Sequence, residues 1–452
     1  MPTVLALAAT LLLAVSSASA EQLCDPVYQD CRAKLLAYVN AEKIRIDIGF
    51  NLWEEPESTR PLLNAVIARH KAGVRVRVIA ELRRESTLNT AVLNALKAAG
   101  IPMRYKLGGG IFHWKLFHFA GQQVVEFAAT NFTPDYLRPR VPYLDGYVDP
   151  VYFATDLAVV QSLARRYEDM WVDTVNFANY ANVTTLSRAY PLWPIVSSLS
   201  FVPQQNFLTR SKPYYDAETT QIDTVMYKIT EPGHADAVIR AAKRGVRVRL
   251  ITEPGHYRST KNLWHAYNLD RMYAAGVQIR ERAHRGFLHQ KTTLLYSQAF
   301  TIFGSSNWAL EGNRGQWEHN YFTSKSWFFT WMRTAFNRRW NNSTGNVETR
   351  AFTPLPPGVP VYVAPANTIS GQSTTVVLSW KPGIWAHRAD VYFGTTSTPP
   401  LYRAALAVSP GSNSVTKFTI SGLTPGRTYY WRIVSKTMAN KSKSGPTWSF
   451  GT

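Results

Sequence analysis

The sequence predicts an α/β fold that is built twice, followed by a separate all-β domain. Three observations predict this fold class. Strand and helix patterns alternate in the first part of the chain, the same alternation returns in the second part, and helical patterns stop after a proline-rich stretch at 353–357. With 452 residues, 45% of them hydrophobic and 18% charged, the chain can bury the cores of two or three domains.

The first α/β unit begins with alternating apolar and polar residues at Ile44–Phe50, a pattern typical of a strand. Apolar residues at helical spacing follow over Pro61–Ala72, and Gly73 suits the end of that helix. Val74–Ile79 is a β-branched strand, and a second helix at about Thr90–Ala99 leads into a third strand. This alternation predicts a largely parallel sheet flanked by helices.

The second half of the chain repeats the first in blocks. Ala65–Arg77 matches Ala237–Arg249, and Ala98–Ile101 matches Ala274–Val277. Each half also closes on a helix with an aromatic residue four positions before a tryptophan, expected to pack against the sheet: Tyr167 and Trp171, then Phe336 and Trp340. Such matching indicates an internal duplication.

Composition and patterning divide the chain into five parts. Residues 1–20 lack charged side chains, contain an apolar run and end in a small-x-small pattern, which predicts a cleavable signal peptide. The α/β halves are expected at 21–195 and 196–350, a proline-rich linker at 351–361, and the β-domain at 362–452. We therefore expect a secreted or periplasmic protein that is soluble after cleavage, because no later apolar run reaches the length of a membrane span.

Charge and cysteine content bear on partners and compartment. The formal net charge of +20 favours polyanions such as nucleic acid, an anionic membrane or cell surface, or phosphate esters. The alternative is a basic secreted protein whose charge aids solubility. The chain has 2 cysteines, Cys24 and Cys31, and in an oxidising compartment they are expected to close a small disulfide loop.

A motif of histidine, lysine and asparagine occurs once in each half, as the following residues: His113, Lys115 and Asn131; His289, Lys291, Ser305 and Asn307. Two lysines and two amides that converge on one point suit a phosphoryl group. One neutral imidazole can attack phosphorus, and the other can protonate the leaving oxygen and then deprotonate water. No cysteine cluster or carboxylate-rich loop is at hand for a metal, so neither a metal nor a cofactor is expected.

These motifs resemble those of the phospholipase D superfamily, in which each half carries H-x-K-x4-D followed by G-S-x-N. The resemblance covers roughly residues 40–345. It implies a duplicated α-β-α sandwich of two pseudo-two-fold related halves. It also implies a covalent phosphohistidine intermediate, with His113 as the nucleophile and His289 as the acid. The second motif is better preserved, which favours the reverse assignment and leaves the two roles open.

The sequence departs from this pattern at three places. Ala120 and Tyr296 stand where the motifs have Asp, and Ala128-Ala129 stands where the first motif has Gly-Ser. Tyrosyl-DNA phosphodiesterases, a branch of the same superfamily, similarly lack that Asp and keep His, Lys and Asn. The departures are therefore compatible with catalysis and leave the substrate class open. Gly108–Gly110 is interpreted as a flexible lead-in to His113.

Each imidazole needs a partner that fixes its tautomer, usually a carboxylate. Glu318 lies where the superfamily places such a glutamate, and Asp149 lines up with it in the first half. We expect these two to be the orienting pair, with surface acids at strand starts as the alternative. Three other histidines lack a counterpart in the other half and are expected to be structural or surface residues: His118, His284 and His319. Three tryptophans beside the motifs are expected either to line a substrate cleft or to pack: Trp114, Trp308 and Trp317.

The C-terminal region reads as short strands at regular spacing. Leu423–Tyr429 and Tyr430–Val434 resemble the tyrosine-corner region of fibronectin type III domains, and Trp380 stands where their early core tryptophan lies. The resemblance implies an immunoglobulin-like β-sandwich that serves as a spacer or binding module.

The leading expectation for function is an exported phosphodiesterase of phospholipase D type that hydrolyses phospholipid head groups to phosphatidic acid. A basic surface spread over both parts of the chain favours an anionic sheet slightly over a nucleic-acid strand. One alternative is a secreted, metal-independent nuclease, since the motif chemistry is the same for any phosphodiester. Another is a binding protein without catalytic activity. A monomer is expected.

Overall fold

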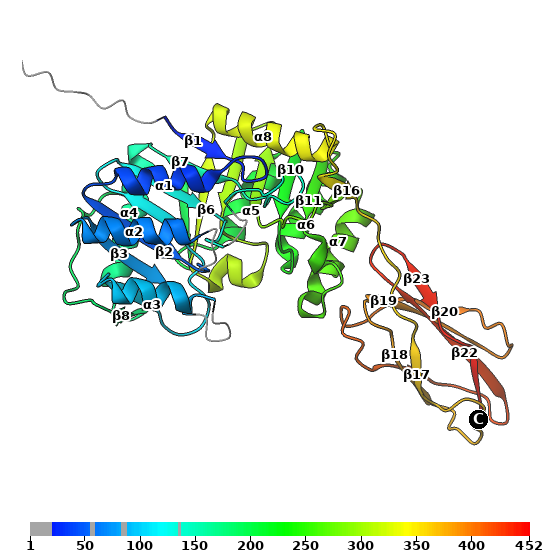
Figure 1. Cartoon of the computed structure of the whole chain (residues 1–452). Helices are drawn as coiled ribbons and strands as arrows, with labels where there is room; N and C mark the ends of the chain where they lie inside the picture. The colour runs from blue at the N-terminus through cyan, green and yellow to red at the C-terminus, as the bar shows by residue number, and fades with distance from the viewer. Residues whose placement is uncertain (1–19, 55–58, 83–87, 134–136) are drawn as a thin grey trace, which may run out of the picture.

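The α/β part of the chain consists of two eight-stranded sheets (Figure 1). The computed structural model describes residues 20–54, 59–82, 88–133 and 137–452, so the predicted signal peptide at 1–20 lies outside this part except for its last residue. The first sheet has the order β1-β7-β6-β5-β2-β3-β4-β8. Its strands are β1 Gln22–Cys24, β2 Arg45–Phe50, β3 Arg75–Ala80, β4 Met103–Lys106, β5 Lys115–Phe119, β6 Val124–Ala128, β7 Val151–Ala154 and β8 Phe177–Ala181.

The second sheet repeats this topology strand for strand. Read from the other edge, its order is β9-β15-β14-β13-β10-β11-β12-β16. The match of strand order in two sheets is what the repeated sequence blocks predict. Its strands are β9 Leu199–Val202, β10 Gln221–Met226, β11 Arg247–Thr252, β12 Gln278–Arg282, β13 Lys291–Leu295, β14 Phe300–Gly304, β15 Glu318–Thr323 and β16 Thr349–Ala351.

The expectation of a largely parallel sheet is wrong. Strands β2, β3 and β4 pair in parallel through helical crossovers, but β5, β6, β7, β1 and β8 all pair antiparallel, and the second sheet behaves alike. The physical reason is the hairpin: β5 and β6 are separated by a tight turn, which can join only antiparallel neighbours. Each motif lysine begins the first strand of such a hairpin.

Helices cover both faces of each sheet. Three helices of each half pack on its outer face, where they share an apolar cluster with that sheet. Helices α4 and α8 lie on the inner side, and their apolar residues join the inner faces of both sheets in one further cluster. The helices are α1 Cys31–Ala41, α2 Arg60–Lys71, α3 Thr90–Ala98, α4 Leu157–Val172, α5 Phe207–Ala217, α6 Pro232–Lys243, α7 Leu263–Ala274 and α8 Ser326–Asn341, with short turns at Pro254–His256, Thr260–Asn262 and Glu311–Gly315.

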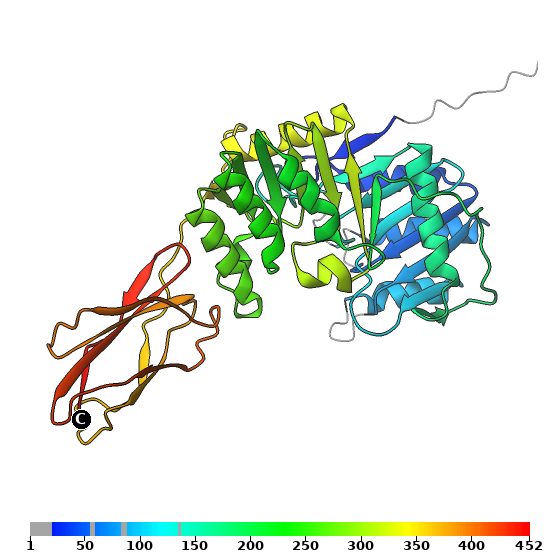
Figure 2. The ribbon, with the colours of Figure 1, turned by 180° about the vertical axis from the view of Figure 1, so that it is seen from behind.

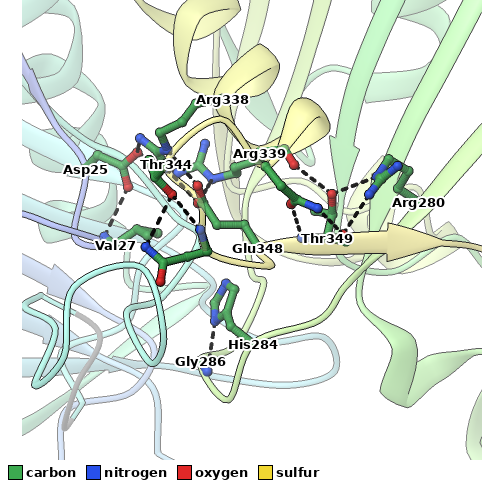
Figure 3. Close-up of polar contacts among 12 residues, drawn as sticks. Asp25, Val27, Arg280, His284, Gly286, Arg338, Arg339, Thr344, Glu348 and Thr349 are labelled. Carbon is green, nitrogen blue, oxygen red and sulfur yellow. Dashed lines mark hydrogen bonds and ion pairs between the residues drawn. The ribbon is translucent and has the colours of Figure 1, made fainter.

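A buried ion cluster ties the N-terminal segment to α8 across the two halves (Figure 3). Oδ2 of Asp25 accepts from Arg339 at 2.6 Å and from Arg338 at 3.0 Å, and Arg338 also donates to Glu348. Two arginines face two carboxylates here, so their charges are compensated although Asp25 and Glu348 are fully buried. The preceding disulfide, Cys24–Cys31, closes the loop that carries Asp25.

The C-terminal region is all-β and projects from the second half (Figures 1 and 2). A three-stranded sheet, β17-β18-β21, faces a sheet of β20-β19-β22-β23 with β24 beside β22, and one apolar cluster around Trp380 and Trp431 lies between them. Trp385 is buried among the residues of the second half's outer cluster and so anchors this region against it. The strands are β17 Val361–Ala364, β18 Val376–Lys381, β19 Arg388–Gly394, β20 Leu401–Ala407, β21 Thr416–Ile420, β22 Thr428–Lys436, β23 Ser442–Ser444 and β24 Trp448–Gly451.

None of the helices in the described ranges is both long enough and apolar enough to cross a lipid bilayer.

Candidate active site

The two His-x-Lys segments meet where the halves face each other. Each histidine lies two residues before the strand that the motif lysine begins, at the start of β5 in one half and of β13 in the other. The rings of His113 and His289 are 6.0 Å apart between centroids, and both side chains are almost fully buried. The structure therefore brings the two motif copies into a single site, with one imidazole from each half.

The carboxylates that accompany the histidines are exchanged between the halves. Nδ1 of His113 lies 2.7 Å from Oε2 of Glu318, and Nδ1 of His289 lies 3.1 Å from Oδ2 of Asp149. Each contact joins a histidine of one half to an acid of the other. With Nδ1 engaged, Nε2 is the nitrogen of His113 left for chemistry, and His289 also makes a hydrogen bond to the backbone of Ala129.

Backbone bridges between the halves hold both contacts in place. The amide of His113 donates to the carbonyl of Trp317 at 2.9 Å, directly before Glu318. The amide of His289 donates to the carbonyl of Val148 at 3.2 Å, directly before Asp149. The chain segment that carries each histidine is thus aligned with the segment that carries its carboxylate.

Two glycines make this close approach possible, and each stands three residues before a motif histidine. A Cβ on Gly110 would lie 2.0 Å from the carbonyl oxygen of Gly315, and one on Gly286 would lie 2.1 Å from that of Gly146. Such distances are far inside van der Waals contact, so a side chain here would push the halves apart. The interpretation of Gly108–Gly110 as a flexible lead-in to His113 is therefore incomplete, because Gly110 is used for contact between the halves.

In each half, a glutamate directly after the central parallel strand accepts a hydrogen bond from the backbone next to the motif histidine. Oε2 of Glu81 accepts from the amide of Phe112 at 2.6 Å, and Oε2 of Glu253 accepts from the amide of Leu288 at 3.0 Å. Phe112 and Leu288 immediately precede the two histidines. Sequence analysis did not single out these glutamates, although each directly follows a matched strand, β3 or β11.

The motif lysines and asparagines surround the imidazoles. Nζ of Lys115 donates to the carbonyl of His113 at 2.8 Å, and Nζ of Lys291 makes the equivalent bond to His289. Both lysines are buried, and Asn131 and Asn307 follow the next strand of each hairpin. In the described part of the chain, neither asparagine side-chain oxygen has a hydrogen-bond partner although both are buried. Each of these oxygens lacks a donor, which a water molecule or a hydroxyl group of a substrate can supply.

Burial shifts the pKa of five titratable groups in the site towards the neutral form of each. It raises the pKa of Asp149 to about 7 and that of Glu318 to about 8, against the opposing effect of the lysines. It lowers the pKa of Lys291 to about 7, and holds the pKa of both His113 and His289 well below the usual value, with the neighbouring lysines acting in the same direction. Both imidazoles are therefore neutral at neutral pH, as a nitrogen nucleophile requires.

Ser305 lies behind Glu318. Its hydroxyl accepts from the amide of His319 at 3.0 Å and donates to the carbonyl of the same residue, and its nearness to Glu318 lowers the pKa of that carboxyl. These contacts make Ser305 a positioning residue for Glu318. The first half has Ala129 at this place, and there the hydroxyl of Thr130 donates to the carbonyl of Asp149 at 3.0 Å.

The positions of the missing motif aspartates lie at the far ends of β5 and β13. Five residues separate Lys115 from Ala120 and Lys291 from Tyr296, a strand length of about 16 Å. The hydroxyl of Tyr296 donates to Asp223 at 2.5 Å, within a cluster that also contains Arg249. Loss of these aspartates therefore leaves the reacting groups themselves unchanged.

The remaining histidines and tryptophans near the motifs have structural contacts. Nδ1 of His118 lies 3.2 Å from Asp47, Nδ1 of His284 accepts from the amide of Gly286, and the ring of His319 packs between aromatic rings. The three tryptophans beside the motifs are buried, so of the two alternatives they pack: Trp114, Trp308 and Trp317.

One aromatic residue of the site was missed by sequence analysis. The ring of Tyr227 lies 4.7 Å from that of His289, and Nζ of Lys291 lies 5.1 Å from its centroid. Tyr227 directly follows β10, and the first half has Asn51 at the matching position, so comparison of the halves could not reveal it. Within the described ranges, no group of three or more His, Cys, Asp or Glu is placed to hold a metal ion.

Comparison with known proteins points to one superfamily. Residues 216–340 match the family model described as "Cardiolipin synthase, PLD-like domain". The fold resembles phosphatidylserine synthase from Haemophilus influenzae Rd KW20, with 13% identity and a TM-score of 0.57 over 74% of this chain and 87% of that one. It also resembles polyphosphate kinase from Porphyromonas gingivalis, with 15% identity and a TM-score of 0.51 over 74% of this chain and 48% of that one. A search of curated proteins found no match. These findings support the phospholipase D superfamily and a duplicated fold of that type.

Proposed function

We propose that this protein is a phosphoryl-transfer enzyme of phospholipase D type that cleaves phosphodiesters through a covalent phosphohistidine. The observation that carries the proposal is the pair of neutral imidazoles, 6.0 Å apart, each oriented by a carboxylate of the other half. Such a pair can act on phosphorus from two sides. Lys115, Lys291 and the two asparagine amides supply the anion site between them.

In the first step, Nε2 of His113 forms a bond to phosphorus while the bond from phosphorus to the leaving oxygen breaks. Glu318 accepts the hydrogen on Nδ1, which leaves the lone pair of Nε2 free for attack. His289 gives the hydrogen on its Nε2 to the leaving oxygen, and its Nδ1 takes the proton of the Asp149 carboxyl, whose raised pKa keeps a proton there. Asp149 is then a carboxylate and the leaving alcohol is neutral.

In the second step, water enters on the side of His289. Nε2 of His289 takes a proton from the water as its oxygen bonds to phosphorus, the proton on Nδ1 returns to Asp149, and the bond between phosphorus and His113 breaks. The lysines stay in place through both steps and balance the charge on the phosphoryl oxygens. The enzyme returns to its starting protonation state.

The substrate that we propose is a phospholipid, with hydrolysis of the head group to phosphatidic acid. Support comes from the spread of positive charge: the chain from residue 355 on has 9 Lys or Arg and one acid, Asp390, a balance of 9 − 1 = +8 out of the total of +20. Such a surface suits an anionic membrane sheet. Export by the predicted signal peptide at 1–20 would bring the enzyme to such surfaces.

We also propose a fibronectin type III character for the C-terminal domain, as a module that holds the enzyme at its substrate. Support comes from the hydroxyl of Tyr429, which accepts from the amide of Thr424 at 2.9 Å as a tyrosine corner does, and from the buried Trp380.

The test of the mechanism uses bis(p-nitrophenyl) phosphate, whose leaving group departs without an acid. His113→Asn is expected to abolish the burst of nitrophenolate, whereas His289→Asn is expected to keep the burst and stall afterwards. Alkaline quenching and peptide mass spectrometry should then find the phosphoryl adduct on His113 in His289→Asn. His284→Asn, which alters another buried histidine, should behave as wild type. An adduct on His289 would reverse the roles, and a full burst in both variants would refute the covalent mechanism.

The test of the substrate compares vesicles of phosphatidylcholine, vesicles of cardiolipin, and plasmid DNA, each in parallel with the wild type and His113→Asn. Release of the head group with formation of phosphatidic acid supports the proposal. Cleavage of DNA at low salt without lipid hydrolysis would replace it with the nuclease. If the protein hydrolyses none of these substrates and does not hydrolyse the nitrophenyl ester either, the result would favour a binding protein without catalytic activity.

A further inference from the structure

A groove lies beside α8 in the second half, at the end of β13 opposite Lys291. Its volume is about 1400 Å³, and its lining includes Trp331, Thr334 and Asn337 of α8 with Arg247 and Tyr296 from the strand ends. Small-molecule pockets usually hold roughly 300–1,000 Å³. The groove is larger and open to solvent, which suits a polypeptide segment better than a compact ligand.

The equivalent groove of the first half is covered by the chain itself. The segment 182–198, which we term the strap, connects β8 to β9 and lies along α4. The amide of Ala189 donates to Glu168 at 2.8 Å, Arg188 pairs with Asp169 at 2.7 Å, and the hydroxyl of Tyr190 donates to Asp47 at 2.7 Å. A proline-rich, aromatic piece of polypeptide thus fills this side of the first half.

The positions that bind the strap on α4 correspond to positions that line the groove on α8. The register is given by two arginines in matching places: Arg77 lies over the rings of Tyr167 and Trp171, and Arg249 lies over those of Phe336 and Trp340. In this register the strap-binding residues and their groove-lining counterparts are Ser162 and Trp331, Arg165 and Thr334, Glu168 and Asn337, and Asp169 and Arg338.

The groove stays open because the chain leaves the second half by another route. After β8 the strap returns along α4 to reach β9. After β16 the chain instead runs past Tyr257, whose hydroxyl accepts from the amide of Leu355, and enters the C-terminal domain. No described segment therefore occupies on α8 the place that the strap occupies on α4.

The groove differs from its counterpart in charge. Glu168 and Asp169 of α4 are replaced by an asparagine and an arginine, Asn337 and Arg338, so the acids that face the strap are gone. The guanidinium of Arg338 is engaged in the ion cluster with Asp25 and Glu348 (Figure 3). Two other arginines of the lining, Arg247 and Arg333, are exposed and have no carboxylate partner within the described part of the chain.

Asp223 does not balance these charges for an incoming segment. It already accepts two hydrogen bonds from Arg249 and one from the hydroxyl of Tyr296. In the first half, the hydroxyl of Tyr190 in the strap donates to Asp47 in the same way, so Tyr296 replaces this strap residue. The polar groups at the bottom of the groove thus have hydrogen-bond partners, whereas its rim exposes aromatic rings and positive charge without a carboxylate partner.

We propose that this groove binds an extended, acidic, aromatic segment of a partner protein, in the way that the first half binds its own strap. The shape of the partner follows from the strap, and its negative charge follows from Arg247 and Arg333. The uncharged residues 1–20 of this chain lack the charge that the groove calls for. This surface is separate from the active site, so the inference does not depend on the proposed enzymatic function.

The test uses a fluorescent peptide with the sequence of residues 186–196 that carries Arg188→Glu, with the unchanged sequence as its comparison. At about 150 mM salt, the full chain should bind the altered peptide saturably in fluorescence anisotropy and the unchanged peptide at least about tenfold more weakly. The double variant Arg247→Glu/Arg333→Glu should lose at least about tenfold in affinity for the altered peptide. The matched control is Arg75→Glu/Lys97→Glu, which makes the same change in charge on the first half and should bind as the wild type does.

Several outcomes would overturn the proposal. Absence of saturable binding, or equal loss in both double variants with unchanged thermal midpoints, would exclude a specific site at α8. Equal affinity for both peptides would exclude selection by charge. Binding only after removal of residues 1–20 would assign the groove to that segment of the same chain. Displacement of the peptide by plasmid DNA or by anionic vesicles, in the wild type but not in Arg247→Glu/Arg333→Glu, would assign it to another polyanion.

Discussion

Replacement of Glu318 by glutamine tests whether the exchanged carboxylates orient the imidazoles or merely fill space. Glu318→Gln keeps the volume of a fully buried side chain 2.7 Å from His113 and, above the pKa of about 8 that burial gives this carboxyl, removes its negative charge. During phosphoryl transfer, positive charge develops on the ring about 4 Å from the carboxylate. At an effective dielectric constant of about 20, this attraction is worth roughly 4 kcal/mol. Since about 1.4 kcal/mol corresponds to tenfold in rate, we expect kcat to fall by about 10³.

The assay is burst kinetics with bis(p-nitrophenyl) phosphate, which separates formation of the adduct from its hydrolysis. Glu318→Gln should slow the burst itself while KM changes little, because the lost interaction strengthens only as the bond to phosphorus forms. The matched control is Glu126→Gln, which alters a carboxyl that is equally buried and whose pKa burial holds well above the usual value. Burst rates within about threefold of wild type for Glu318→Gln, or equal losses in both variants, would refute the orienting role.

Three further predictions concern charge and stability. Burial brings the pKa of both Lys291 and Asp149 to about 7, so Lys291 loses its positive charge and Asp149 its proton as the pH rises, and kcat/KM should fall above about pH 7. In Lys291→Arg, which stays charged, the fall should become less steep because only Asp149 then titrates there; an equally steep fall would contradict the role of Lys291. Since the lysines do the cationic work, activity should survive EDTA, and complete loss that a divalent ion restores would show that the chemistry is wrong. Asp25→Asn removes the carboxylate 2.6 Å from the buried Arg339 and leaves it only Glu348 at 4.0 Å, so it should lower the free energy of unfolding by about 3–5 kcal/mol in urea titration. Asp216→Asn, at an exposed ion pair, should cost less than about 1 kcal/mol, and similar costs in both would show that the ion cluster is not structural.

Much of the site could be predicted because duplication makes each half a check on the other. His113 and His289 stand at matching places, and the structure places both in one site. The exchange of carboxylates could not be predicted in detail, since alignment pairs Asp149 with Glu318 but does not say which imidazole either one reaches. That choice is made by the packing of the two inner sheet faces. The place of Tyr227 in the site could not be predicted because the first half has no tyrosine at the matching position.

The prediction of a largely parallel sheet was wrong because the hydrophobic pattern of these strands does not distinguish parallel from antiparallel pairing. Residues Lys115–Phe119 are all buried, as are Lys291–Leu295, so neither strand shows the alternation that would mark an antiparallel pair with one wet face. Continuous burial is usual for parallel strands, but here it arises because helices cover both faces. The position of the strap could not be predicted from the sequence because its residues have no periodic pattern. Its role is visible only from its contacts with α4 and Asp47.

The exchange of carboxylates has a consequence for how this chain can change over generations. A site in which each half supplies a histidine to the acid of the other is what two identical subunits would build about a two-fold axis. In such a dimer every substitution strikes both half-sites at once. Here the two half-sites are encoded by different parts of one chain, so that Ala129 can replace a hydroxyl in one half while Ser305 keeps it in the other. Joining the copies in a single polypeptide frees the nucleophile and the acid to be tuned one at a time.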